Sequence, residues 1–287
     1  MEQNIGIYPE PVVFAPHSGQ HKQTFIILHG RGDTAGNFGP QILDWYVTDH
    51  QTLRRAFPNA KFVFPGAALR RVQLNGLAIA SQWFDSGHPG REQGKKYDDL
   101  QIEGLRESTK YLHGLMQDAI AEVGASNLIV GGLSQGGATT LTAMMLWEGE
   151  PIACWFGLCA RLPFRPRITQ AIDELKRNSG WRGLPDLAGE DLSKAAKLRC
   201  ARDWLYKELE IPDSPVPGTS RNEGSRGPIF LGHGTLDPLV PLHLGSESAL
   251  LLENIGLKTD WRQYEGLGHW YSPDMLKDLI EFISAGF

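Results

Sequence analysis

One serine lies inside a glycine-rich stretch of the sequence, GGLSQGG at residues 131–137. Within it, Gly132, Ser134 and Gly136 match the pattern G-x-S-x-G, typical of a sharp turn from a strand into a helix that exposes the serine hydroxyl. A hydroxyl presented in this way can attack a carbonyl carbon. An ordinary glycine-rich turn has the same composition, so the sequence on either side of the motif must distinguish the two interpretations. An apolar run at 127–131 precedes the serine and a helical pattern follows it, which favours the chemical interpretation.

A serine hydroxyl needs a base to take its proton and an acid to orient that base. After such a turn, the expected chain order is serine, then Asp or Glu, then His. His243 and His269 both lie well downstream of Ser134. His269 stands in the glycine-rich stretch EGLGHWYSP, whereas His243 stands at an expected helix start, where a solvated or capping role fits better. We therefore predict His269 as the base.

The acid should follow a strand between the serine and the histidine. Asp237 meets this condition, because it follows the apolar run PIFLG within residues 228–241. Asp237 could also cap the helix expected after it. The other candidates fit less well, because Asp98 and Asp99 precede the serine and Asp260 lies inside an expected strand. We predict Asp237 as the acid.

The reaction also needs donors for the oxyanion that forms on the attacked carbonyl group. One donor is expected to be the backbone N–H of Gln135, directly after the nucleophile, and the second to come from a loop after an early strand. Residues 25–38, FIILHGRGDTAGNF, form such a loop, and the N–H of Arg31 is the candidate. His29 precedes the serine and is expected to be structural. Asp33 is expected to bind backbone groups of its own loop.

Short apolar runs that alternate with helical patterns must position these residues. The clearest helical pattern covers 101–123, a second follows Ser134, and a third covers 273–283. Runs that are apolar on both faces suit a parallel sheet covered by helices, so we predict an α/β fold with a mostly parallel central sheet. The expected strands are 24–28, 61–64, 127–131, 152–158, 228–232 and, nearer an edge, 259–264.

Residues 165–226 interrupt this alternation and are predicted to be a helical insertion within a single domain of residues 1–287. Two stretches read as helices, and 211–228 is rich in Pro, Gly and Ser. The insertion precedes Asp237, so it could fold over the site as a lid. A lateral extension or a dimer contact are the alternatives. The apolar underside of a lid would be formed by Trp181, Leu184, Leu187, Trp204 and Leu205.

Composition excludes several classes of protein. The chain has 287 residues, 41% hydrophobic content and a formal net charge of −5, so neither nucleic acid nor an anionic membrane surface is expected as the main partner. Its three cysteines do not suggest a disulfide framework, and no secretory signal or membrane-spanning run is visible. These features predict a cytoplasmic protein. The motifs of metal, phosphate and dinucleotide sites are missing, so no cofactor or metal is expected.

Six sequence blocks in the same order resemble the acyl-protein thioesterases and their relatives, the phospholipase/carboxylesterase family of α/β-hydrolases. They cover most of residues 24–164 and 227–285. The blocks are LHGRGDT (28–34), KFVFPGAALRRVQLNGLAIASQWFD (61–85), LIVGGLSQGG (128–137), LCARLPF (158–164), HGTLDPLVP (233–241) and YEGLGH (264–269).

The resemblance implies an α/β-hydrolase fold and the same five site residues that the spacing predicts. It implies an enzyme that cleaves esters or thioesters through an acyl-enzyme, acting on a small-molecule or lipid ester or on an S-acylated protein. Arg31 departs from the family, which usually has an apolar residue there, and the insertion has no counterpart in its compact members. An esterase for small or aromatic acyl groups, or a binding protein without turnover, are the alternatives. Trp83 is expected to contact substrate, or else to pack in the core.

Overall fold

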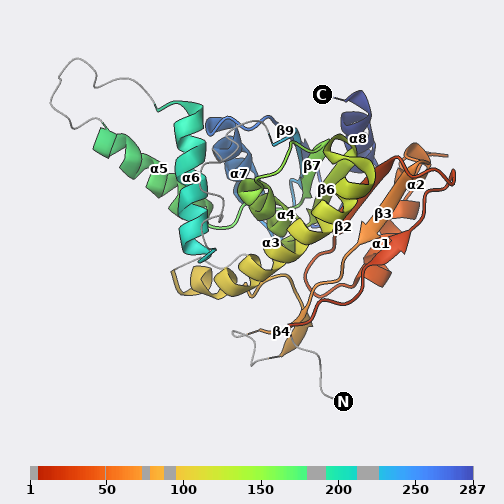
Figure 1. The fold of residues 1–287 in the computed structure, drawn as a ribbon, viewed down its shortest axis with the longest axis horizontal. Helices are drawn as coiled ribbons and strands as arrows, with labels where there is room; N and C mark the ends of the chain where they lie inside the picture. Colours follow the sequence, from red (N-terminus) through yellow and green to blue (C-terminus); the bar gives the residue numbers. More distant parts are fainter. Residues whose placement is uncertain are drawn as a thin grey trace.

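Seven strands form a central sheet in the order β1-β3-β2-β6-β7-β8-β9 (Figure 1). β1 pairs antiparallel with β3, and the other neighbouring pairs are parallel. The strands are β1 (Val12–Phe14), β2 (Gln23–Leu28), β3 (Ala60–Phe64), β6 (Leu128–Leu133), β7 (Cys154–Leu158), β8 (Ile229–Gly234) and β9 (Thr259–Tyr264). This computed structural model describes residues 6–48, 50–72, 78–86, 95–179, 192–211 and 226–286.

Helices cover both faces of the sheet. α1, α2 and α8 contribute to the hydrophobic core on one face, and α3 to α7 contribute to the core on the other. The helices are α1 (Ala35–Asp44), α2 (Leu53–Ala56), α3 (Lys95–Val123), α4 (Gln135–Leu146), α5 (Arg165–Ser179), α6 (Lys194–Glu208), α7 (Leu242–Asn254) and α8 (Pro273–Ala285). A short 3₁₀ turn, Ala125–Asn127, leads into β6.

The two-sided burial of the strands explains why they read as continuous apolar runs. In β2, Phe25 and Ile27 pack in one core, whereas Ile26 and Leu28 pack in the other. All four side chains are 0–1% exposed. Alternate residues of a strand point to opposite faces, so a sheet with helices on both sides needs apolar residues at every position. The predicted α/β architecture with a mostly parallel sheet is therefore confirmed.

α4 differs from the amphipathic helix that its sequence pattern indicates, because every residue of α4 is buried. It lies against β6 and β7 and is covered by α3 and α6 (Figure 1). The hydroxyls of Thr139, Thr140 and Thr142 each donate to the carbonyl group four residues earlier, at 3.0 Å. These bonds satisfy the polar atoms inside the helix, so a partly polar helix can be buried on all sides.

Several element boundaries differ from the predicted ones. β6 runs to Leu133 and so ends directly before the serine, two residues later than predicted. β7 begins at Cys154 rather than 152, and α3 begins at Lys95 rather than 101. The predicted edge strand is confirmed as β9. The sequence analysis did not predict β1, the helices α1 and α2, or the antiparallel hairpin of β4 (Leu69–Arg71) and β5 (Ile79–Ser81).

The predicted insertion contributes two described helices at one flank of the molecule (Figure 1). α6 packs on α4 and α5, and α5 also contacts α7. Leu205 is fully buried, and the ring of Trp204 lies 5.8 Å from that of Phe164. The other three residues proposed for a lid underside, Trp181, Leu184 and Leu187, lie outside the described residues.

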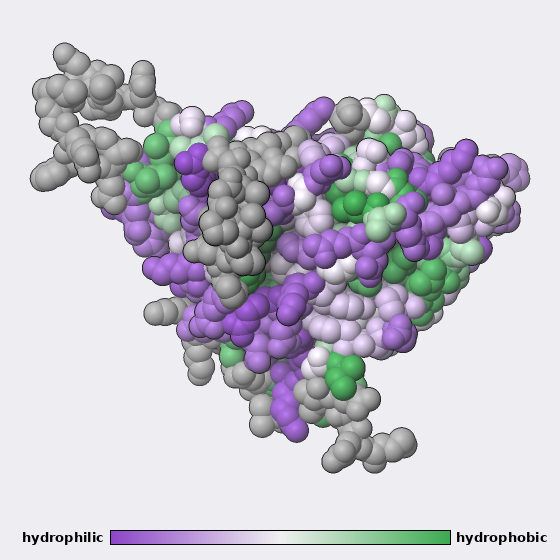
Figure 2. All heavy atoms as spheres, viewed as in Figure 1, coloured by the Kyte–Doolittle hydropathy of each residue, from purple (hydrophilic) through white to green (hydrophobic). Residues whose placement is uncertain are grey.

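Hydrophilic side chains cover much of the face seen in Figure 2, and hydrophobic side chains form small areas between them. Among the described residues, seven large apolar or aromatic side chains are exposed, including Leu236 and Leu239 on either side of Asp237. Among the described helices, none combines the length and the hydrophobicity needed to cross a membrane.

Candidate active site

Ser134 lies at the junction between β6 and α4, in the strand-to-helix turn that its sequence pattern predicts. Its backbone has φ 56° and ψ −119°, a strained conformation for a residue with a side chain. Two glycines allow the turn. A Cβ at Gly132 would lie 2.6 Å from the Gly136 carbonyl carbon, and a Cβ at Gly136 would lie 2.5 Å from the backbone oxygens of Leu28 and His29. Backbone atoms cannot yield as side chains do, so both positions require glycine.

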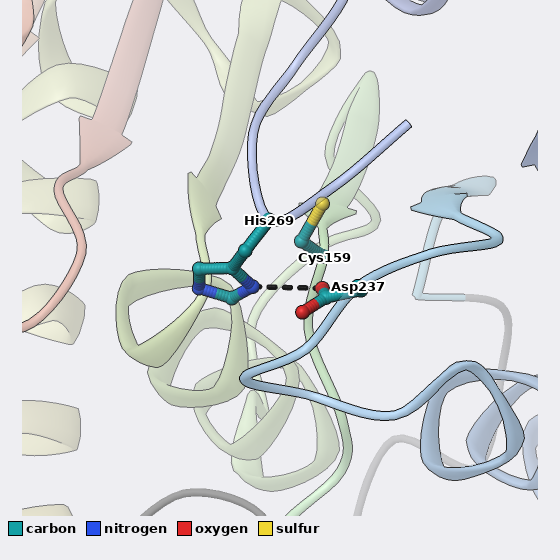
Figure 3. A group of neighbouring side chains, drawn as sticks. All are labelled: Cys159, Asp237 and His269. Atoms are coloured by element: carbon teal, nitrogen blue, oxygen red, sulfur yellow. Dashed lines mark hydrogen bonds and ion pairs between the residues drawn. The ribbon is translucent and has the colours of Figure 1, made fainter. Parts of the chain in front are cut away.

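The structure brings Ser134, His269 and Asp237 together, although 135 residues separate the first two. His269 Nε2 lies 2.8 Å from Ser134 Oγ, and His269 Nδ1 lies 2.7 Å from Asp237 Oδ2. Figure 3 shows His269 and Asp237 directed toward each other from different loops. A carboxylate only accepts, so Nδ1 carries the proton and Nε2 can accept the Ser134 hydroxyl proton. This is the hydrogen-bond chain that activates a serine.

Asp237 is held by donors on both of its oxygens. Oδ1 accepts from the backbone N–H groups of Leu239 at 2.9 Å and Val240 at 2.8 Å. Oδ2 accepts from His269 and lies 3.2 Å from His233 Nε2. Burial alone would raise the pKa of Asp237, but the hydrogen bonds from His233, His269 and Val240 outweigh it and hold that pKa well below its usual range. The carboxyl group is therefore ionised at neutral pH.

Two neighbours of the acid, His233 and Cys159, were not predicted as parts of the site. Both lie at the carboxyl ends of parallel strands, which meet at one edge of the sheet. Their position there was the available signal. The Cys159 thiol donates to the Trp270 carbonyl at 3.4 Å, and burial raises its pKa to about 12, so it stays protonated.

Cys159, Asp237 and His269 are also the group of described side chains best placed to bind a metal ion, with ligand atoms within 4.8 Å of one another (Figure 3). The Asp237 and His269 atoms in this group are already hydrogen-bonded to each other, and the thiol is protonated. A metal ion binds cysteine as the thiolate and histidine through a ring nitrogen that carries no proton. The arrangement therefore fits an acid–base pair better than a metal site.

Gln135 contributes through both its backbone and its side chain. As the first residue of α4, its N–H has no acceptor within the helix and is available beside Ser134. Its side chain accepts from Trp83 N–H at 2.8 Å and donates to the Phe84 carbonyl at 2.8 Å and to Ser86 Oγ at 3.3 Å. The side chain thereby fixes segment 83–86 beside the turn, a role that its sequence position did not reveal.

The loop after β2 passes beside the serine, and the role of the Arg31 N–H as the second oxyanion donor stays a prediction. Gly30 precedes Arg31, and a Cβ at Gly30 would lie 3.6 Å from Ser134 Cβ. The Arg31 guanidinium donates to the Ser86 carbonyl at 3.1 Å, so its charge lies against segment 83–86. Asp33 Oδ1 accepts from the Thr34 N–H at 2.8 Å, which is the local backbone role expected of it.

His29 and Trp83 are structural in this arrangement. His29 accepts from Ala67 N–H at Nε2 and donates to the Gly30 carbonyl from Nδ1, and burial lowers its pKa. Trp83 is 0% exposed, and its indole N–H donates to the His29 carbonyl at 2.8 Å. The structure thus places Trp83 in the core. Its expected contact with substrate stays a prediction.

The alternative acids and base lie apart from this constellation. His243 is exposed at the start of α7. Asp98 and Asp99 belong to α3. Asp260 is paired with Arg262 at 3.0 Å within β9.

Comparisons with known proteins show which family the sequence resembles. The family model described as Phospholipase/Carboxylesterase matches residues 9–179 and 212–286, so the unmatched part of the predicted insertion is 180–211. Acyl-protein thioesterase 1 of Gibberella zeae is 27% identical over 274 residues, which cover 95% of this chain and 94% of that protein. Acyl-protein thioesterase 1 of Kluyveromyces lactis is 24% identical over 266 residues, which cover 92% of this chain and 91% of that protein.

A solved structure shows the same fold. The crystal structure of Zea mays acyl-protein thioesterase 2 has a TM-score of 0.66 and 22% identity, and the match covers 97% of this chain and 99% of that one. The predicted α/β-hydrolase fold is therefore confirmed. On the family match across both parts of the chain, together with this fold, the chain belongs to the phospholipase/carboxylesterase family.

Proposed function

We propose that this protein is a serine hydrolase that cleaves carboxylic esters or thioesters through an acyl-enzyme intermediate. The observation that carries the proposal is the hydrogen-bond chain from Ser134 Oγ through His269 to Asp237. The strained backbone at Ser134 supports it, because strain of this kind persists at sites where the side chain must be presented. Membership in the phospholipase/carboxylesterase family supports the same class of reaction.

In the proposed mechanism, His269 Nε2 takes the hydroxyl proton while Ser134 Oγ attacks the acyl carbon. Asp237 holds the imidazole in position and stabilises the cation that forms. The N–H groups of Gln135 and Arg31 stabilise the oxyanion. His269 then returns the proton to the leaving alcohol or thiol. A water molecule activated by His269 attacks the acyl-enzyme, and the carboxylic acid leaves. These steps use this chain's own groups and water.

For the substrate, we propose a long-chain acyl ester or thioester, including an S-acylated protein. The names of the fungal relatives and of the maize structure, which are acyl-protein thioesterases, support this class. A small or aromatic acyl group is the second candidate. Arg31 favours this second candidate, because its guanidinium, which contacts the Ser86 carbonyl, places a charge beside segment 83–86. A long apolar acyl chain would gain no favourable contact with that charge.

We also propose that residues 1–287 form one domain and that the helices of the insertion brace its flank. Arg202 Nε donates to the Met145 carbonyl at 3.1 Å, and Tyr206 Oη donates to the Leu146 carbonyl at 3.0 Å. These carbonyls lie at the end of α4 opposite Ser134. A lid over the site and a dimer contact are the alternatives for the insertion, residues 165–226. A cytoplasmic location remains our expectation, supported by the three cysteines, all of which are free.

The function is tested with p-nitrophenyl esters from acetate to palmitate and with a palmitoyl thioester. We expect hydrolysis of both bond types and labelling of the protein by a fluorophosphonate probe. Ser134→Ala should abolish labelling and lower kcat by at least about 10³-fold, whereas Ser86→Ala is the matched control that should still be labelled. Full activity in Ser134→Ala would refute the mechanism. A preference for acetate over palmitate would favour the second substrate class.

The lid alternative has a separate test. Replacing Trp181, Leu184 and Leu187 with serine should leave chain-length preference unchanged if the insertion only braces the flank. A changed preference with unchanged thermal stability would support a lid instead.

A further inference from the structure

His233 is a second imidazole beside the acid of the site. It is the penultimate residue of β8, and its side chain is 0% exposed. α7 packs against one edge of the ring, where a Cβ at Gly245 would lie 2.5 Å from Nδ1. Trp261 of β9 packs on it with ring centroids 5.8 Å apart. The ring is therefore held in one orientation by three elements.

The hydrogen bonds of His233 define its protonation. Nε2 lies 2.8 Å from the Val240 carbonyl oxygen and 3.2 Å from Asp237 Oδ2. A carbonyl oxygen only accepts, so Nε2 carries a proton. Nδ1 is buried and has no hydrogen-bond partner among the described residues. A proton on Nδ1 would be a buried donor without an acceptor, so the contacts of the ring favour the tautomer that carries its proton on Nε2.

An apolar side chain could fill this position without burying an unpaired nitrogen. A buried nitrogen without a hydrogen-bond partner is unfavourable for folding. The presence of histidine at this position therefore indicates that the Nε2 proton has a role. That proton links the two ends of the turn from Asp237 to Val240. The same turn supplies the Leu239 and Val240 N–H groups to Asp237 Oδ1. Oδ1 therefore has two donors from the turn, and His233 gives Oδ2 a second donor beside His269, so the plane of the carboxylate is held from both sides.

We infer that His233 is a positioning residue of the catalytic triad, a neutral donor that orients Asp237 toward His269 by bridging its carboxylate and the Val240 carbonyl. The inference rests on the proposed function, because it acts through Asp237 on the reaction at Ser134. Within the part of the chain that the structure describes, the charged group in contact with His233 is the Asp237 carboxylate. His269 and the protonated Cys159 thiol face Asp237 from the β9–α8 loop and the end of β7.

Two substitutions of His233 by amide side chains of different length test the hydrogen bond that its Nε2 donates. The Nε2 of glutamine falls where His Nε2 lies, whereas the amide of asparagine is one bond shorter and cannot reach Asp237 or Val240. We expect His233→Asn to lower kcat/KM about 10- to 100-fold, which corresponds to losing a hydrogen bond to a charged group. His233→Gln should stay within about threefold of the natural protein, since it keeps an uncharged donor.

The pH profile separates positioning from mere packing. Without the donor from His233, the carboxylate keeps more charge facing His269 and favours its cation, so the acidic limb of kcat/KM should move to higher pH in His233→Asn. His233→Gln should keep the natural midpoint. Trp261→Leu, which loosens the ring without removing the donor, should lower the unfolding temperature and leave the midpoint unchanged. Equal losses in the two amide variants, or an unmoved midpoint in His233→Asn, would overturn the inference.

A second measurement does not depend on activity. The ¹⁵N chemical shifts of His233 in the natural protein, measured at the pH of the activity assay, should show a proton on Nε2 and none on Nδ1. A proton on Nδ1 under those conditions would overturn the inference, even if hydrolysis were normal. Failure of the proposed function would instead appear as no hydrolysis and no probe labelling of the natural protein, so the two failures are distinguishable.

Discussion

The side chain of Gln135 should carry much of the stability of the segment beside the nucleophile. It accepts from the Trp83 N–H and donates to the Phe84 carbonyl, both at 2.8 Å. Trp83 and Phe84 are 0% and 3% exposed, so water does not replace these bonds while the side chains keep their places. We expect Gln135→Ala to destabilise the protein without removing the Gln135 backbone N–H.

The magnitude follows from the two groups left without partners. A buried donor or acceptor that loses its partner costs about 1–3 kcal/mol, so two cost about 2–6 kcal/mol. Alanine leaves space in which water can bind one of them, which reduces the expected loss to about 2–4 kcal/mol. At about 2–4 °C per kcal/mol for a chain of this size class, the unfolding temperature should fall by about 5–15 °C.

Gln135→Met is the matched control because methionine fills the space but bonds neither group. If hydrogen bonding dominates, the methionine variant should be at least as destabilised as the alanine variant, since it excludes the water. The assay is urea unfolding followed by tryptophan fluorescence, with fluorophosphonate labelling to show that the nucleophile is intact. A methionine variant as stable as the natural protein would show that packing, not hydrogen bonding, is the contribution of Gln135, and the reasoning would fail.

Three further predictions concern the turn and the acid. Asp237→Asn should lower kcat for p-nitrophenyl butyrate by about 10³- to 10⁴-fold, because an amide favours the wrong tautomer of His269, and a loss below tenfold would contradict this. Gly136→Ala should destabilise by more than about 2 kcal/mol in urea unfolding, whereas Gly114→Ala in α3, with open space around its Cβ, should be neutral or stabilising by up to about 1 kcal/mol. Because the pKa of Asp237 is depressed by folding, its contribution to stability is complete above the ordinary pKa of about 3.9 and is lost as pH falls through the lower folded value. Asp237→Asn should therefore flatten the acid-side loss of stability below about pH 4, and an unchanged slope would count against the depressed pKa.

Chain order and strand ends were sufficient to predict how the triad residues come together. In a parallel sheet the carboxyl ends of the strands meet at one edge, so residues that follow different strands become neighbours in space. Ser134 follows β6, Asp237 follows β8, and His269 follows β9, each within a few residues of the strand. The prediction needed no knowledge of helix packing, and errors of two residues in the strand boundaries did not affect it.

Features set by contacts between distant residues were not predictable in this way. β1 and the β4–β5 hairpin have only three residues per strand, too few for a pattern to stand out. The burial of α4 on all sides depends on α6, whose position follows from side-chain contacts with the far end of α4. The site of Trp83 depends on the His29 carbonyl, 54 residues away. Aromatic character alone does not distinguish a pocket wall from a core.

The residues around Asp237 show where sequence reasoning ends. A motif identifies side chains by the reaction they can perform, and it therefore selects the acid and the base. It does not select His233, because a neutral imidazole that donates one hydrogen bond has no reaction of its own. Its role exists only through the 3.2 Å separation from Asp237 and the 2.8 Å separation from the Val240 carbonyl. Substitutions at such a position should change the pH dependence of the site while every residue of the motif remains in place.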